Sequence, residues 1–155
     1  DHYVVRELIR KCCEVKKHVV EQDPEERGIR ATLNLGHTVG HAIEKLKNFK
    51  LTHGECVALG TVCAAEISHE RGYLSTEEFY EIRDMNVGFN LPITVDGINP
   101  DDILEVSRQD KKIEHGLRRF ILLKSIGNAV IDDTVTDEEV LRAFDFINGD
   151  RIDGE

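Results

Sequence analysis

Three of the seven histidines lie close together in the sequence, at positions 37, 41 and 53, whereas the other four lie among charged neighbours and are expected to be solvated. His37 and His41 are spaced i, i+4, so on a helix both imidazole rings project from the same face. His53 falls at the expected first turn of the next helix, where the helix dipole disfavours a charged imidazole and keeps the ring neutral. Because neutral imidazole is the form that binds metal ions, the spacing favours a metal or proton-transfer site.

Two glycines, Gly36 and Gly40, flank this histidine pair. A glycine inside a helix costs about 1 kcal/mol relative to alanine, so two of them indicate close approach of a backbone or a ligand. A catalytic zinc takes three protein ligands and keeps one position open. Two of the histidines with one carboxylate would supply those ligands, and the third histidine would be left for acid–base chemistry. The alternative is that the H-x-x-x-H pair is only a set of surface or satisfied polar residues.

Arg30 and Asn34 precede the histidines and are also spaced i, i+4. If the helix begins this early, they extend the edge formed by His37 and His41. An arginine and an asparagine beside a metal would bind an anionic, hydroxylated substrate through charge-assisted and ordinary hydrogen bonds. The alternative is a solvent-facing arginine and an asparagine that caps a helix.

The elements that must position these residues are mainly helical. An apolar period of 3.6 residues begins at Val4 and stops at Gln22, before Asp23 and Pro24, and predicts one long helix. Local capping and turn signals predict further helices over residues 33–47, 53–71, 76–85, 100–108 and 137–148, and a hairpin with strands 118–123 and 128–131. Four of these helices are expected to begin after capping boxes at Thr52 and Ser75, a capping Asn99 before Pro100, and the run that starts at Thr136. We therefore expect a mainly α fold, a helical domain with one small β-hairpin.

Composition narrows the class of protein. The 155 residues contain 20 Lys and Arg against 30 Asp and Glu, a net charge of -10, which argues against nucleic acid and anionic membrane surfaces as partners. Four cysteines without a C-x-x-C pair favour a reducing compartment, and we find no secretory or lipidation motif, so we expect a cytoplasmic protein. Because the chain begins with Asp1 inside a helical pattern, we expect it to be part of a longer protein.

The stretch from Gly28 to Glu44, followed by His53-Gly54-Glu55, resembles the signature of the 3-dehydroquinate synthases. The similarity extends upstream to Lys16 and downstream through Asp110-Lys111-Lys112 to the predicted hairpin. It implies that residues 1–155 form a single helical domain, the C-terminal half of a two-domain enzyme. That family converts the phosphorylated keto-acid DAHP to 3-dehydroquinate and phosphate in the shikimate pathway, using NAD and a divalent metal, Zn²⁺ or Co²⁺.

The resemblance also implies a role for individual residues. His37 and His53 match metal ligands, whereas His41 and Glu26 match acid–base residues. The positions that match substrate-binding residues are Lys16, Arg30, Asn34 and one of the two lysines Lys111 and Lys112. In the family a third ligand, a glutamate, and the NAD-binding domain precede the region that matches this chain, and no G-x-G-x-x-G motif occurs here.

We therefore expect the isolated 155 residues to be catalytically inactive. The expected partners are an anionic sugar-phosphate substrate, the N-terminal domain of the same enzyme and, for the complete enzyme, a second copy in a homodimer. Three alternatives stay open: a sister sugar-phosphate cyclase, a metal-dependent alcohol or glycerol dehydrogenase, and a non-catalytic helical interaction module with structural histidines. The edge of Arg30 and Asn34 suits an anionic substrate better than glycerol.

Overall fold

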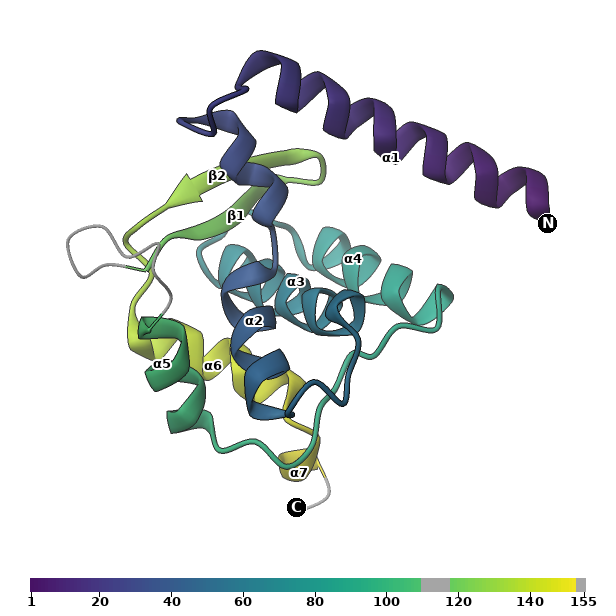
Figure 1. Cartoon of the computed structure of the whole chain (residues 1–155). Coiled ribbons are helices and arrows are strands. Elements are labelled where there is room, and N and C mark those ends of the chain that lie inside the picture. The colour runs from purple at the N-terminus through teal and green to yellow at the C-terminus, as the bar shows by residue number, and fades with distance from the viewer. Residues whose placement is uncertain (110–117, 153–155) are drawn as a thin grey trace. The chain divides into compact units, whose positions relative to one another are not determined.

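The computed structural model describes residues 1–109 and 118–152, and the chain divides into two compact units, residues 1–33 and 34–155. The elements in chain order are α1 (His2–Gln22), the 3-10 helix η1 (Ile29–Asn34), α2 (His37–Leu46), α3 (His53–Glu70), α4 (Thr76–Gly88), α5 (Pro100–Arg108), β1 (Phe120–Ser125), β2 (Asn128–Asp132), α6 (Asp137–Ile147) and α7 (Gly149–Ile152) (Figure 1). The described residues are thus mainly helical with one hairpin, as predicted. Lys111 and Lys112 lie outside them.

The first unit is dominated by α1, which ends at Gln22 as predicted because Pro24 disfavours helix in the residue before it. The carboxylate of Asp1 caps the helix by accepting from the backbone N of Tyr3 at 2.9 Å. None of the 21 residues of α1 is buried, so its apolar stripe is exposed. Within the described part of the chain, no helix has both the length and the apolar character needed to cross a membrane.

The second unit is built around α3, in which ten of 18 residues are buried. This helix packs against α2, α4, α6 and β1 (Figure 1). The two predicted capping boxes are confirmed, because the hydroxyls of Thr52 and Ser75 begin α3 and α4. The predicted start of the last helix is confirmed too, and Thr136 forms a third capping box there. The predicted cap at Asn99 is confirmed for α5. Short local signals therefore determine where most helices of this unit begin.

The hairpin is antiparallel and pairs Phe120 with Asp132 at its open end. Its first strand is buried over four residues and is tied to α3 through Ser68. The Ser68 hydroxyl accepts from the backbone N of Leu123 at 3.0 Å and donates to the carbonyl of Ala64 at 2.7 Å. A buried serine thus links the first strand of the hairpin to α3 and has both of its own hydrogen bonds satisfied.

The predicted start of the second helix is wrong. A continuous helix was expected from Leu33, but η1 ends at Asn34 and α2 begins only at His37. Between them Gly36 adopts a left-handed φ of +77°, and a Cβ there would lie 2.5 Å from the carbonyl oxygen of Val57 on α3. Contact with α3 therefore interrupts the helix, and the expected edge that places Arg30 and Asn34 on one helix with the histidines does not form.

A candidate metal centre

The structure brings the three histidines together. The ring centroids lie 5.2 Å apart for His37 and His41, 5.2 Å for His37 and His53, and 5.7 Å for His41 and His53. One ligand nitrogen of each ring lies within 4.8 Å of the other two. Two rings come from the first turns of α2 and the third from the first turn of α3, so two helix starts build the cluster.

Glycine contacts between α2 and α3 hold these two helix starts together. A Cβ on Gly40 would lie 2.9 Å from the carbonyl oxygen of Cys56, and a Cβ on Gly60 would lie 1.9 Å from the carbonyl oxygen of Gly36. The helices therefore meet backbone to backbone at positions where no side chain fits. The close approach expected from the glycines beside the histidines is confirmed, and the third member, Gly60, was missed because it is distant in sequence.

The environment of His37 favours a neutral ring. Its Nδ1 lies 3.2 Å from the carbonyl oxygen of Leu35, and that acceptor requires a proton on Nδ1. Burial lowers the pKa of His37 most strongly; the hydrogen bond to Leu35 opposes this, while the charges of His41 and His53 lower the pKa further. A neutral ring with Nδ1 protonated offers its Nε2 lone pair to a cation.

The cluster fits a divalent cation. Zinc binds imidazole nitrogen at about 2.0–2.1 Å, so two nitrogens on one zinc lie at most about 4.2 Å apart. Ring nitrogens within 4.8 Å of one another reach that separation by small ring rotations. Imidazole suits Zn²⁺ and Co²⁺ better than Mg²⁺ or Ca²⁺. The separate roles of His37 and His53 as ligands and of His41 as proton carrier stay predictions, because all three rings are within reach of one ion.

An aspartate that the sequence reasoning did not assign a role organises the loop of the first unit. The Asp23 carboxylate accepts from the backbone N of Arg27 at 2.9 Å, of Gly28 at 2.7 Å and of Arg30 at 3.0 Å. These amides, led by those of Arg27 and Arg30, lower the pKa of Asp23. The sequence signal was available, because an aspartate at a helix end before proline and glycine is typical of such turns.

The other candidate residues are distributed over both units. Lys16 is exposed on α1, and Glu26 is exposed in the loop with a left-handed φ of +56°. Arg30 is half-buried, and its Nη1 donates to the carbonyl of Pro24 at 2.8 Å. Asn34 ends η1 and is half-buried. Their roles in substrate binding and proton transfer stay predictions.

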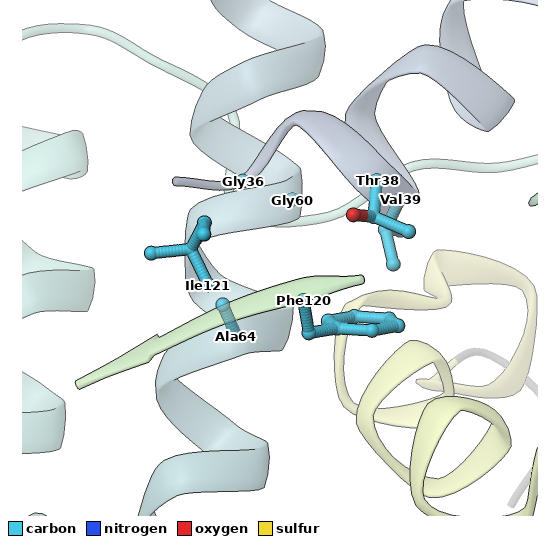
Figure 2. A pocket seen from close by; sticks show the side chains of 7 residues that line it. All are labelled: Gly36, Thr38, Val39, Gly60, Ala64, Phe120 and Ile121. Carbon is cyan, nitrogen blue, oxygen red and sulfur yellow. The ribbon is translucent and has the colours of Figure 1, made fainter. Parts of the chain in front are cut away.

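A small pocket lies where α2, α3 and β1 meet (Figure 2). It is lined by Gly36, Thr38, Val39, Gly60, Ala64, Phe120 and Ile121. The hydroxyl of Thr38 donates to the carbonyl of Arg119 at 2.9 Å. The lining carries no ionisable side chain and none of the three histidines, so this pocket does not suit an anionic substrate. It is a gap in the packing between α2, α3 and β1.

One histidine outside the cluster is not solvated as expected. His69 is half-buried, its ring stacks on Phe79 with centroids 5.5 Å apart, and its Nε2 lies 3.2 Å from the hydroxyl oxygen of Thr76. Its neighbours are charged in sequence, but α4 folds back over it. His2 and His18 are exposed, as predicted.

The helical unit with its convergent imidazoles has the fold of the sugar-phosphate cyclases. A solved 2-epi-5-epi-valiolone synthase from Streptomyces hygroscopicus, with NAD⁺ and Zn²⁺ bound, superposes with a TM-score of 0.79 at 23% identity. The match covers 89% of this chain and 38% of that one. A 2-deoxy-scyllo-inosose synthase complexed with carbaglucose-6-phosphate, NAD⁺ and Co²⁺ superposes with a TM-score of 0.73 at 23% identity, over 88% of this chain and 40% of that one.

Sequence comparison identifies the family. Residues 1–113 match the family described as 3-dehydroquinate synthase C-terminal. The chain is 44% identical over 132 residues to a 3-dehydroquinate synthase of Psychrobacter cryohalolentis, which covers 84% of this chain and 36% of the relative. It is 39% identical over 145 residues to a 3-dehydroquinate synthase of Prochlorococcus marinus, and this alignment covers 93% of this chain and 40% of the relative. The chain therefore belongs to the 3-dehydroquinate synthase C-terminal family, and it spans 36–40% of the length of these relatives.

Proposed function

We propose that this chain is the metal- and substrate-binding part of a 3-dehydroquinate synthase, which converts DAHP to 3-dehydroquinate and phosphate with NAD and a divalent cation. The observation that carries the proposal is the convergence of His37, His41 and His53 to within 4.8 Å. The curated relatives named 3-dehydroquinate synthase and the solved cyclases with NAD⁺ and Zn²⁺ or Co²⁺ support it.

In this proposal His37 and His53 hold the cation through Nε2, since their Nδ1 atoms face Leu35 and Glu44. When bound, the cation would polarise a substrate hydroxyl and the nicotinamide would accept hydride from the same carbon. His41 lies beside both rings and would take the hydroxyl proton and return it when the ketone is reduced.

Positively charged side chains near the site would bind the substrate's carboxylate and phosphate, although the chain as a whole has a net charge of -10. Arg30 supplies a planar guanidinium, Lys16 a point charge and Asn34 an amide for hydroxyl groups. The backbone of Arg30 is already fixed by Asp23, which reduces the ordering that binding requires. Glu26 would act as a further acid–base group, and one of the lysines at 111 and 112 would contact the phosphate or the carboxylate.

Metal content tests the centre directly. We expect the chain, fused behind the N-terminal part of the Psychrobacter cryohalolentis synthase so that a third ligand is supplied, to bind about one Zn²⁺ or Co²⁺ after dialysis. His37→Ala and His53→Ala should lose this metal, whereas His18→Ala, which removes an exposed imidazole of α1, should retain it. A fusion that binds no metal, or that binds it equally well as His37→Ala, would support the alternative in which the histidines are structural.

A turnover assay tests the reaction. The chain alone should form no dehydroquinate from DAHP and NAD, because it spans 36–40% of its relatives. Fused behind the N-terminal part of the Psychrobacter cryohalolentis synthase, it should turn over DAHP. Turnover of sedoheptulose 7-phosphate instead of DAHP would identify a sister sugar-phosphate cyclase. Turnover of DAHP by the chain alone would contradict the expectation that the N-terminal part is required for activity. The proposal also includes a cytoplasmic location. It further includes a homodimer for the complete enzyme, and light scattering of the fusion would measure that oligomeric state.

A further inference from the structure

Glu44 lies on α2 one turn beyond His41, on the face that carries the histidines, and points its carboxylate at α3. Its Oε2 lies 3.4 Å from Nδ1 of His53. The Glu44 side chain is only 19% exposed, whereas that of His53 is 54% exposed. A carboxylate that is largely withdrawn from water requires a hydrogen-bonded or charged partner, and the imidazole N–H of His53 provides one.

We propose that Glu44 is a positioning residue of the metal centre: its carboxylate accepts the Nδ1–H of His53 and so leaves Nε2 as the nitrogen that binds the cation. The part of this inference that concerns the cation rests on the function proposed above. The part that concerns the tautomer of His53 does not, because it follows from the contact between the two side chains.

The arrangement repeats one already described at His37. There the carbonyl oxygen of Leu35 lies 3.2 Å from Nδ1, and here the carboxylate of Glu44 lies 3.4 Å from Nδ1. Both acceptors fix the proton on the same ring nitrogen, so both Nε2 atoms keep a lone pair. Metal-bound histidines almost always donate their other N–H to a carbonyl or a carboxylate in this way.

A direct ligand role for Glu44 is less consistent with the geometry. The described cluster whose ligand atoms lie within 4.8 Å of one another consists of His37, His41 and His53 and does not include Glu44. The charge of Glu44 is also felt at Cys56, one turn beyond His53 on α3: burial raises the pKa of the Cys56 thiol, and the charge of Glu44 raises it further.

The tautomer of His53 in the metal-free chain is the first test. It can be measured by ¹⁵N NMR of the ring nitrogens at a pH where imidazole is neutral, with the signal assigned through His53→Gln. We expect the Nδ1–H tautomer in the wild-type chain and a shift toward Nε2–H in Glu44→Ala. Glu44→Gln keeps a carbonyl acceptor and should restore Nδ1–H. Glu81→Ala removes an exposed carboxylate of α4 and should leave His53 unchanged.

Metal affinity is the second test, measured by competition with a chelator and by the visible spectrum of bound Co²⁺. Loss of such a partner costs about 10–100-fold in affinity, so we expect that loss in Glu44→Ala, a smaller one in Glu44→Gln and none in Glu81→Ala. A role confined to folding would lower the urea midpoint without altering the tautomer or the Co²⁺ spectrum.

The outcomes separate the two proposals. An Nε2–H tautomer in the wild-type chain, or one unchanged by Glu44→Ala, would overturn the positioning role. A tautomer that depends on Glu44, together with no metal bound by the fusion with the N-terminal part of the Psychrobacter cryohalolentis synthase, would support the contact and contradict the proposed metal centre. Dependence of both the tautomer and the affinity on Glu44 would support both.

Discussion

The two longest helices of this chain, α1 and α3, contrast in a way that bears on the site. α1 has 21 residues, a regular apolar stripe and no buried residue, whereas α3 has 18 residues of which ten are buried. A clear 3.6-residue period therefore identifies a helix without showing that anything covers it. A helix buried on several faces has a weaker period, and its capping box is the clearer signal.

The candidate site residues follow the same division. His53 stands on α3, and His37 and His41 stand on the helix that packs against it, so backbone contacts between glycines fix their spacing. Lys16, the loop residue Glu26 and Arg30 belong to the unit of α1, where one carboxylate, Asp23, organises the loop. We therefore expect changes in the second unit to affect global stability and changes in the first unit to act locally.

The largest losses of stability should come from buried positions of α3, and Gly60→Ala tests the position at which this helix meets α2. A Cβ at this position would lie 1.9 Å from the carbonyl oxygen of Gly36, so α2 and α3 must separate. We expect the free energy of unfolding to fall by about 3 kcal/mol in urea titrations. Gly54→Ala is the matched control, because a Cβ there meets nothing within 4 Å. Equal stability of the two variants would show that the glycine crossing does not fix the helices.

A pH titration of stability should show a loss on the order of 2 kcal/mol in acid, after allowance for solvent screening. The Arg71 guanidinium donates to Glu139 at 2.6 and 2.8 Å and lowers the pKa of Glu139 from 4.5 to about 2. Because the folded-state pKa is depressed, the stabilisation is complete above about pH 4.5 and is lost as the pH falls toward about 2.

The variant that isolates this contribution is Glu139→Gln, and its stability should depend less on pH in that window. Glu138→Gln, an exposed carboxylate in the same first turn of α6, should keep the wild-type dependence. If both variants followed the wild-type curve, the acid sensitivity of the second unit would have another source.

In the first unit, Asp23→Ala should act locally and more weakly. Loss of this acceptor frees the backbone amides of Arg27, Gly28 and Arg30, and we expect their hydrogen exchange to quicken about tenfold. Amides of α3 should keep their protection. Glu25→Ala removes an exposed carboxylate of the same loop and serves as the control. Faster exchange throughout α3 would contradict the separation of the two units.

The smallest effect should come from Val15→Ala on α1. Val15 is exposed, so we expect a change within about 0.5 kcal/mol in the free energy of unfolding. Leu59→Ala, at a fully buried position of α3, should cost about 2–5 kcal/mol in the same measurement. A loss above about 1 kcal/mol for Val15→Ala would show that the stripe of α1 is covered in solution.

The elements that local chemistry specifies could be predicted from the sequence. The caps at Thr52, Ser75 and Thr136 each involve residues within three positions, and each helix start was correct. The i, i+4 spacing likewise indicated that His37 and His41 share a face. Family resemblance added the metal roles, which the spacing alone left open.

The features that the sequence reasoning missed depend on residues far apart in the chain. The helix break at Gly36 follows from contact with Val57 and Thr61 of α3, and no local signal marks it as different from Gly40. The contact of Glu44 with His53 joins two helices across a turn whose path was not foreseen. The short α7 and the bridge between Val95 and Asn148 were missed for the same reason.

The glycine crossing of α2 and α3 has a consequence for how the histidine cluster should respond to compression. Main-chain atoms of Gly36 and Gly60 already touch, so hardly any empty volume remains there for hydrostatic pressure to remove. The distances between the three imidazoles should then change little at pressures of kilobars. The exposed helix α1 and the loop that follows it should change conformation at lower pressure.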